Sequence, residues 1–298
     1  MNTISSISDF HRLLNLPSPS HPLVSVIRLE EATFIKDDVW QHFFATFYCV
    51  ALKREVQSRM KYGQNYYDFD KGVMSFTAPK QVQSLDPALI EKSNGYVLAF
   101  HHDFMVRHPL ANTIKSYGFF SYAVNEALHL SEKEEEDMIM ILEKISREYQ
   151  HIDRHTQTII LSQIDLLLSY SNRFYERQFI TRKKVNTDLL VKFEAVVADY
   201  FDRNKSQEHG LLTVQYLADQ LNLSPNYLSD MLRVHTGQST QQHLQTMLIE
   251  KAKELLLTTS MSVSEIAYLL GFEYPQSFNK LFKTKTQYSP LQFRHSYN

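Results

Sequence analysis

Polar side chains that can recognise nucleotide bases occupy the outward sides of two expected helices near the C-terminus. In the first helix they are Asn226, Ser229, Asp230 and Arg233. In the second they are Gln276, Ser277, Asn279, Lys280 and Lys283. Asn and Gln can pair with adenine edges, Arg and Lys with guanine or phosphates, and an acid can accept from cytosine. These helices therefore carry chemistry suited to reading double-stranded DNA.

Both helices belong to an internal repeat of a helix, a sharp turn and a second helix. The two copies span residues 212–244 and 261–294. Each second helix has an apolar stripe, formed by Leu228, Met231 and Leu232 or by Phe278, Leu281 and Phe282. The small Ala218 and Ala267 suit a close crossing of two helices. Asn222 and Gly271 fall at the turns, where a left-handed backbone is best tolerated. The repeat predicts helix-turn-helix units at 213–237 and 262–287.

Capping residues mark the ends of the expected helices. Thr213 and Ser262 are expected to cap the first helix of each unit, and Ser224 followed by Pro225 starts a second helix. Residues 239–258 read as one connecting helix. At about 25–30 Å it can hold two reading helices in successive major grooves, which lie about 34 Å apart. The open alternative is a pair of hairpins without DNA function, because any surface helix has a polar face.

The first 130 residues are expected to be mainly strands. Candidate strands are 23–29, 43–52, 72–77 and 95–100, with 43–52 read as buried on both faces. This spacing predicts a small barrel or sandwich. Ser131 and Glu134 form a capping box for a helix that pairs with a second one around 159–168, and the acids from Glu132 to Asp137 read as its solvated start. The polar, basic segment 171–185 is interpreted as a linker, with DNA phosphates as the alternative contact of its charges.

Composition bounds the remaining classes. A chain of 298 residues with 43% hydrophobic content suits two folded domains. A single cysteine, Cys49, rules out an internal disulfide framework and is expected to be a buried, inert thiol. No stretch reaches the roughly 18 apolar residues of a membrane span, so we expect a cytoplasmic protein without membrane contact. The adjacent His101 and His102, on a strand, and the helically spaced His151 and His155 suggest no complete metal site. No cofactor, metal or catalytic residue is expected.

The C-terminal residues resemble the AraC/XylS family of bacterial transcription regulators. The similarity covers about 190–294 and is carried by Ile266-Ala267, Gly271-Phe272, Phe278, Phe282-Lys283, Ser289-Pro290 and Phe293-Arg294. It implies that Asn226, Ser229, Asp230 and Arg233, then Pro275, Gln276, Ser277 and Lys280, approach promoter DNA. Two positions depart from the family pattern. Gln287 replaces a usual glycine, which predicts a reshaped turn, and Asp230 replaces a basic or polar residue.

The N-terminal part is similar to the cupin-like sensing domains of that family, through Tyr67-Asp68-Phe69 to Ala78-Pro79 and Phe119-Phe120. The expected fold is α+β with two domains: a cupin-like β-barrel with a helical hairpin, and an all-α domain of two helix-turn-helix units. The expected ranges are 1–130 for sensing, 131–185 for a hairpin that can dimerise and a linker, and 186–298 for DNA binding.

The expected function is regulation of promoters in response to a small-molecule effector. The expected partners are promoter DNA, an unknown effector, a second copy in a homodimer and RNA polymerase. Two alternatives stay open: a metal-dependent barrel enzyme with a DNA-binding tail, and a protein that bends DNA without sequence preference.

Overall fold

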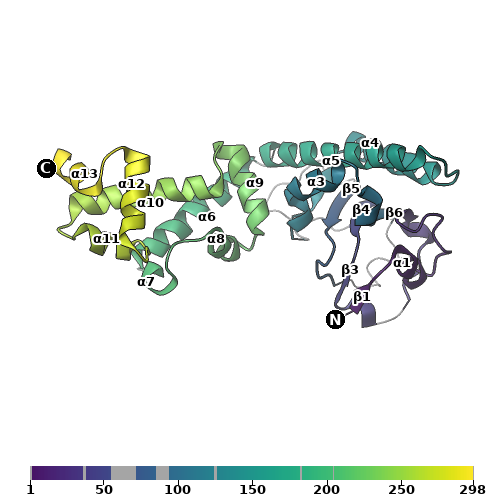
Figure 1. Cartoon of the computed structure of the whole chain (residues 1–298), viewed down its shortest axis with the longest axis horizontal. Coiled ribbons are helices and arrows are strands. Elements are labelled where there is room, and N and C mark those ends of the chain that lie inside the picture. Colours follow the sequence, from purple (N-terminus) through teal and green to yellow (C-terminus); the bar gives the residue numbers. More distant parts are fainter. Residues whose placement is uncertain are drawn as a thin grey trace. The chain divides into compact units, whose positions relative to one another are not determined.

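The chain forms two compact units, residues 1–181 and 182–298 (Figure 1). The computed structural model describes residues 2–35, 38–54, 72–84, 94–123, 126–181, 183–203 and 205–297. The boundary between the units falls inside the segment 171–185 that the sequence analysis interpreted as a linker. Each unit is described by itself below.

The N-terminal unit is built on an antiparallel sheet of five strands in the order β2-β6-β4-β5-β7. These strands are β2 (Val24–Arg28), β4 (Tyr48–Arg54), β5 (Gly72–Thr77), β6 (Asn94–Phe100) and β7 (Leu128–Leu130). A parallel pair, β1 (Asn2–Ile4) and β3 (Phe43–Ala45), lies beside helix α1 (Ile7–Leu13). The sheet has β2 and β7 as edges among the described residues, so the expected closed, cupin-like barrel is not confirmed. Residues 67–69, part of the basis for that resemblance, lie outside the described residues.

The two faces of the sheet contact different elements. Helices α4 (Glu132–Glu148) and α5 (Thr156–Thr181) cover one face, where the Tyr149 hydroxyl hydrogen-bonds the backbone of Val26 on β2 (Figure 1). The opposite face forms a second core with α1, β1 and β3, around the fully buried Trp40. Short helical turns complete the unit: η1 (Leu29–Glu31), η2 (Asp38–Trp40), η3 (His102–Met105), α3 (Leu110–Thr113), η4 (Ile114–Ser116) and η5 (Gly118–Ser121).

The apolar run 43–52 was expected to be one strand buried on both faces, and this was wrong. The run breaks between β3 and β4, where Thr46 donates its N–H to the carbonyl of Ile4 at 3.1 Å. Along β4 the buried residues alternate with half-buried ones such as Cys49 and Ala51. Those small residues are apolar because they face the second core, so the sequence has no polar residues to mark the second face.

Helix α5 is much longer than expected and runs through most of the segment interpreted as a linker. Phe174, Tyr175 and Phe179 continue the buried stripe of α5 to its end. The charged residues Arg173 and Arg177 occur on the same turns and suggested a solvated segment. They are compatible with a packed helix because an α-helix buries only one side.

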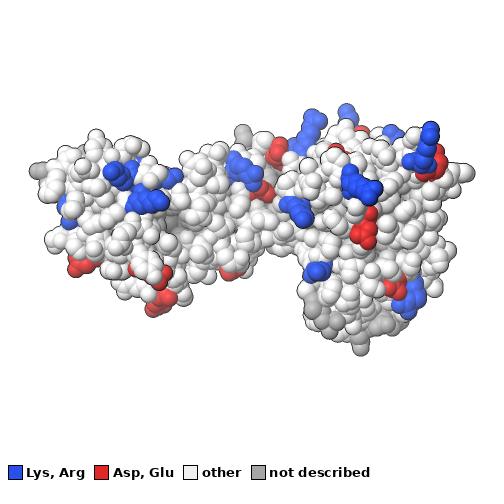
Figure 2. Space-filling view, in the orientation of Figure 1, with Lys and Arg blue, Asp and Glu red and all other residues white. Residues whose placement is uncertain are grey.

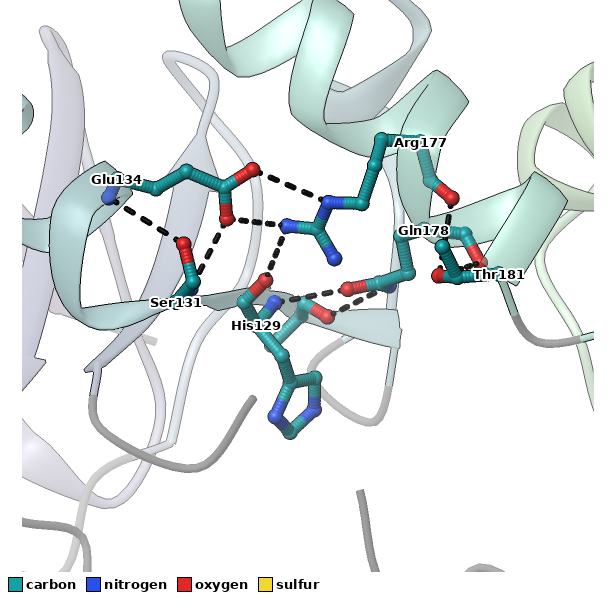
Figure 3. A network of polar contacts seen from close by, with 7 residues as sticks. His129, Ser131, Glu134, Arg177, Gln178 and Thr181 are labelled. Atoms are coloured by element: carbon teal, nitrogen blue, oxygen red, sulfur yellow. Dashed lines mark hydrogen bonds and ion pairs between the residues drawn. The ribbon is translucent and has the colours of Figure 1, made fainter. Parts of the chain in front are cut away.

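Two neighbouring side chains of α5 complete the edge of the sheet (Figure 3). Gln178, itself buried, accepts the N–H of His129 at 2.8 Å and donates to the carbonyl of Ala127 at 3.2 Å. Arg177 donates to the carbonyl of His129 at 2.8 Å and forms an ion pair with Glu134. The α5 side chains therefore take the hydrogen bonds that a further strand would supply to β7, and they protect its edge.

Helix α4 begins as expected at Ser131, with the capping box of Ser131 and Glu134 present. The acidic first turn, however, is not simply solvated. Glu134 also binds Arg177, and the buried Glu135 lies 2.5 Å from the Arg54 guanidinium at the end of β4. Through these two ion pairs, Glu134 connects α4 to α5 and Glu135 connects α4 to the sheet.

The C-terminal unit is entirely helical in the described residues. It comprises α6 (Lys183–Asp202), α7 (Lys205–His209), α8 (Val214–Leu221), α9 (Pro225–Thr236), α10 (Thr240–Thr258), α11 (Val263–Leu269), α12 (Pro275–Thr286) and α13 (Pro290–Tyr297). The pairs α8–α9 and α11–α12 are the two predicted helix-turn-helix units, and both contact α10 (Figure 1). Among the described residues of the whole chain, no helix combines the length and apolar composition needed to cross a membrane.

Both predicted turns adopt the left-handed backbone. Asn222 has φ +54° and Gly271 has φ +89°. Gly271 is further constrained by the chain before the first unit, since a Cβ added there would lie 2.2 Å from the carbonyl oxygen of Gly210. The second turn therefore requires glycine for both its backbone conformation and its close packing.

The turns that end α9 and α12 are nearly identical, although Gln287 stands where the first copy has Gly237. The φ and ψ angles are 71° and 3° at Gly237, and 67° and −2° at Gln287. In each turn a threonine hydroxyl accepts an N–H two residues on at 3.2 Å, from Gln238 and Tyr288 respectively. The expectation of a reshaped turn at Gln287 was wrong, and a non-glycine residue adopts the strained conformation instead.

We predict that Gln287→Gly stabilises the C-terminal unit by about 1 kcal/mol, because glycine adopts this conformation without steric conflict. Gly237→Ala is the matched opposite change, since an added methyl group there meets no atom within 4 Å and only the backbone is strained. Urea unfolding followed by far-UV circular dichroism measures both effects. The fluorescence of Trp40, the single tryptophan, monitors the N-terminal unit as an internal control. A Gln287→Gly protein no more stable than wild type would contradict this strain.

We predict that Gln178→Leu destabilises the N-terminal unit by about 2 kcal/mol, because the buried N–H of His129 and the carbonyl of Ala127 lose the amide that they bind. Gln163→Leu on the same helix is the control. The Oε1 of Gln163 is buried and has no hydrogen-bond partner among the described residues, so its replacement is expected to be neutral or stabilising. The unfolding midpoint from Trp40 fluorescence separates the two variants, and equal effects would overturn the role of Gln178.

Candidate nucleic-acid interface

Buried apolar stripes fix the orientation of α9 and α12. Ser224 caps α9 by accepting the N–H of Tyr227 at 3.2 Å, and a proline occupies the first position of both helices. The residues predicted for the stripes are fully buried, except that Leu281 is half-buried. Because one side of each helix is fixed in the core, the opposite side must face solvent.

The two helices present their predicted residues at corresponding positions. Asn226 is the second residue of α9 and Gln276 the second residue of α12, and both are exposed. Neither side chain has a hydrogen bond to another described residue. An amide side chain is thus available at the start of each helix. Pro275, which precedes Gln276, is half-buried.

Ser229 does not fully match the expectation of an outward base-reading residue. It is half-buried, and its hydroxyl donates to the carbonyl of Pro225 at 2.8 Å. The same hydroxyl accepts from Thr240 of α10 at 3.0 Å. Ser229 therefore helps to hold α9 against α10, a contact that its spacing in the sequence cannot reveal.

Asp230 and Arg233 form an ion pair one turn apart on α9. The Asp230 side chain is half-buried and the Arg233 side chain is 63% exposed. The acid that replaces the usual basic or polar residue is thus offset by a cation on its own helix. Such exposed pairs contribute only about 0–1 kcal/mol, so Arg233 can exchange its partner for a phosphate.

Helix α12 carries the denser group of available polar side chains. Those of Gln276, Ser277, Lys280 and Lys283 are exposed and make no hydrogen bond or ion pair within the described chain, and the same holds for Asn279 and Lys285. Figure 2 shows Lys and Arg side chains gathered over α12, whereas Asp and Glu lie over α7 and α11. In a chain of net charge −2, this separation gives the surface over α12 a locally positive character.

One basic residue of this unit has a structural role that the sequence analysis missed. The Arg294 guanidinium donates from Nε to the carbonyl of Leu256 at 2.9 Å and from Nη2 to that of Met261 at 2.7 Å. It therefore links the end of α10 to the residues just before α11, where the second helix-turn-helix begins. A polar residue also missed is Tyr274, which immediately precedes α12 and is 59% exposed beside Gln276.

Other chemistry finds little support in the structure. The described residues contain no group of three or more His, Cys, Asp or Glu side chains that could hold a metal ion. His102 lies in a helical turn after β6, and His151 and His155 lie between α4 and α5, so neither expected spacing is realised. Burial raises the pKa of the Cys49 thiol to about 12, which keeps it protonated and poorly nucleophilic as expected.

Comparison with known proteins finds matches to transcription regulators. Residues 217–296 match a family model described as Helix-turn-helix domain. The raffinose operon transcriptional regulatory protein RafR of Pediococcus pentosaceus is 36% identical over 84 residues, covering 28% of this chain and 30% of RafR. The HTH-type transcriptional activator RhaS of Enterobacter sp. (strain 638) is 37% identical over 78 residues, covering 26% of this chain and 28% of RhaS.

Among solved structures, the C-terminal domain of the two-component response regulator yesN from Fusobacterium nucleatum subsp. nucleatum is similar over 34% of this chain and 96% of that domain. The sequence identity is 35% and the TM-score is 0.29.

The sequence matches span less than a third of RafR and of RhaS. The matched helix-turn-helix domain agrees with the structure of the C-terminal unit, in which two helix-turn-helix pairs contact α10. The C-terminal unit is therefore identified as a helix-turn-helix domain of the AraC type.

Proposed function

We propose that the protein is a sequence-specific DNA-binding transcription regulator in which α9 and α12 read promoter DNA. The observation that carries the proposal is the pair of second helices, each fixed by a buried stripe. Each starts with an exposed amide side chain that has no hydrogen bond to another described residue. The names of RafR and RhaS, both regulators of transcription, support the same conclusion.

The length of α10 supports binding of both helices to one duplex. Its 19 residues correspond to about 28 Å of helix, against about 34 Å between successive major grooves of straight DNA. Two reading helices at this separation fit neighbouring grooves best when the DNA bends toward the protein.

Each predicted residue has a role in this proposal. Asn226 and Gln276 read base edges, with Ser277 and Lys280 beside Gln276, and Pro275 supplies an apolar contact. Lys283 and Arg233 bind phosphates, the latter by leaving Asp230, and Ser229 orients α9 rather than reading a base. The exposed hydroxyl of Tyr274 adds a contact to the sugar-phosphate backbone.

The N-terminal unit is proposed to bind a small-molecule effector and to pair with a second copy. A cavity of about 540 Å³ within this unit supports effector binding. Pairing is supported by exposed apolar side chains of α5, Ile159, Leu166 and Ile180, which lie whole heptads apart and so share one side of the helix. The effector would change the population of DNA-binding states, with RNA polymerase as a further partner and the cytoplasm as the location.

Selection of bound sites from random double-stranded DNA tests the function. We expect two half-motifs whose centres lie about one helical turn, roughly 10 base pairs, apart, because α9 and α12 read successive grooves. Selected sites that share no motif would contradict sequence-specific reading and would favour a protein that only bends DNA.

Two variants of α12 separate base reading from phosphate binding. Gln276→Ala is expected to relax the preference at one or two bases by about 1–3 kcal/mol, while binding to unrelated DNA is unchanged. Lys283→Ala is expected to weaken binding to all sequences alike and to reduce the slope of log K against log salt by about 1. Affinities measured by fluorescence anisotropy on the selected site and on scrambled DNA distinguish them. Equal loss on both DNAs from Gln276→Ala would refute its base-reading role.

A further inference from the structure

The cavity of the N-terminal unit has a defined chemical character. It lies against the face of the sheet that carries Cys49 and Ala51, and its lining also includes residues of α1, β1, β3, β5 and α5. Its volume of about 540 Å³ is in the range of sites for small ligands. The described lining is dominated by aromatic and aliphatic side chains, including Phe10, Phe34, Phe43 and Phe47. Such a lining suits an apolar ligand of flexible or aromatic structure.

One charged side chain lines this cavity among the described residues, and it is Lys53 on β4. Lys53 shares the face of the strand with Cys49 and Ala51 because side chains two apart point the same way. It is half-buried and makes no ion pair or hydrogen bond with another described residue. Burial lowers the pKa of its ammonium group, as expected for a cation that has lost water without gaining a counter-charge.

Two charged residues described near Lys53 have partners of their own. Arg54, the next residue, has its guanidinium on Glu135 at 2.5 Å. Glu30, an acid near the same end of the sheet, accepts the N–H of Gly95 at 3.2 Å and makes no ion pair with Lys53. Among the described lining residues, Lys53 is therefore the one charged group, and it has no counter-charge there; the remaining described lining is apolar or uncharged.

We propose that this cavity binds a monocarboxylate with an apolar chain, whose carboxylate pairs with Lys53 while the chain packs against the phenylalanine rings. A single negative charge balances a single lysine, whereas a phosphate head group would be expected to recruit arginine, of which none lines the described cavity. The inference rests on the proposed function, because it gives the chemical class of the effector assigned there to the N-terminal unit. In this proposal the carboxylate of the effector forms an ion pair with Lys53.

Titration calorimetry of the full-length protein with three ligands of equal chain length tests the proposal. The probes are octanoate, 1-octanol and octylamine at pH 7. We expect the wild-type protein to bind octanoate at least tenfold more tightly than 1-octanol and to bind octylamine most weakly. The Lys53→Gln variant is expected to lose this preference, with octanoate and 1-octanol binding within about twofold of each other. The exposed Lys115 supplies the matched control, so Lys115→Gln should bind as wild type does.

The fluorescence of buried Trp40, which packs against the cavity residues Phe34 and Phe43, verifies that each variant is folded. The comparison of head groups on the wild-type protein is decisive even if a variant fails to fold. Absence of octanoate binding, an equal affinity for 1-octanol, or a preference that persists in folded Lys53→Gln would each overturn the proposal. DNA-site selection is a separate measurement. Failure of octanoate binding with intact site selection would refute the ligand class alone, and failure of selection with intact octanoate binding would refute DNA reading alone.

Discussion

The packing of the apolar stripes of α9 and α12 is the constraint on which the candidate interface depends. Once Leu228 and Leu232, or Phe278 and Phe282, are buried, the rotation of each helix about its axis is fixed. Everything opposite the stripe is then solvent-facing by geometry, whatever its chemistry. The Thr240–Ser229 hydrogen bond adds a specific contact between α9 and α10. The polar ridges are thus consequences of core packing, and their residue types can vary without changing the fold.

The same relation between a fixed scaffold and a variable polar surface holds within the repeat itself. The turns that end α9 and α12 have matching hydrogen bonds, and even Gln287 adopts the backbone conformation of Gly237. The outward positions differ: Asp230 is paired with Arg233 on α9, whereas its counterpart Lys280 on α12 is unpaired in the described chain. The α12 ridge is consequently the more positive of the two, and we infer that it contributes more of the phosphate binding.

In the N-terminal unit, side chains of α5 form the hydrogen bonds that a neighbouring strand would form with β7. Arg177 and Gln178 supply the hydrogen bonds of the β7 edge, and Glu134 joins the start of α4 to the same cluster. Since this arrangement covers one face and one edge of the sheet, the opposite face is left to form the second core and its cavity. The lining of that cavity includes apolar residues of β4, and this explains why the strand was read from the sequence as buried on both sides.

The two helix-turn-helix units and the helix between them can be predicted from the amino-acid sequence alone. Their caps, turns and stripes are local features, so Ser224, Asn222 and the 3.6-residue period of α9 predict their own structure. The stripe also predicts which side of each helix faces solvent. Contacts between helices are visible only in the folded chain: Ser229 binds Thr240, and Arg294 binds carbonyls at the end of α10 and at Met261. In the N-terminal unit the tertiary structure decided the open sheet, the full length of α5 and the position of Lys53, because strand partners and the covering of a face are set by residues far apart in the chain.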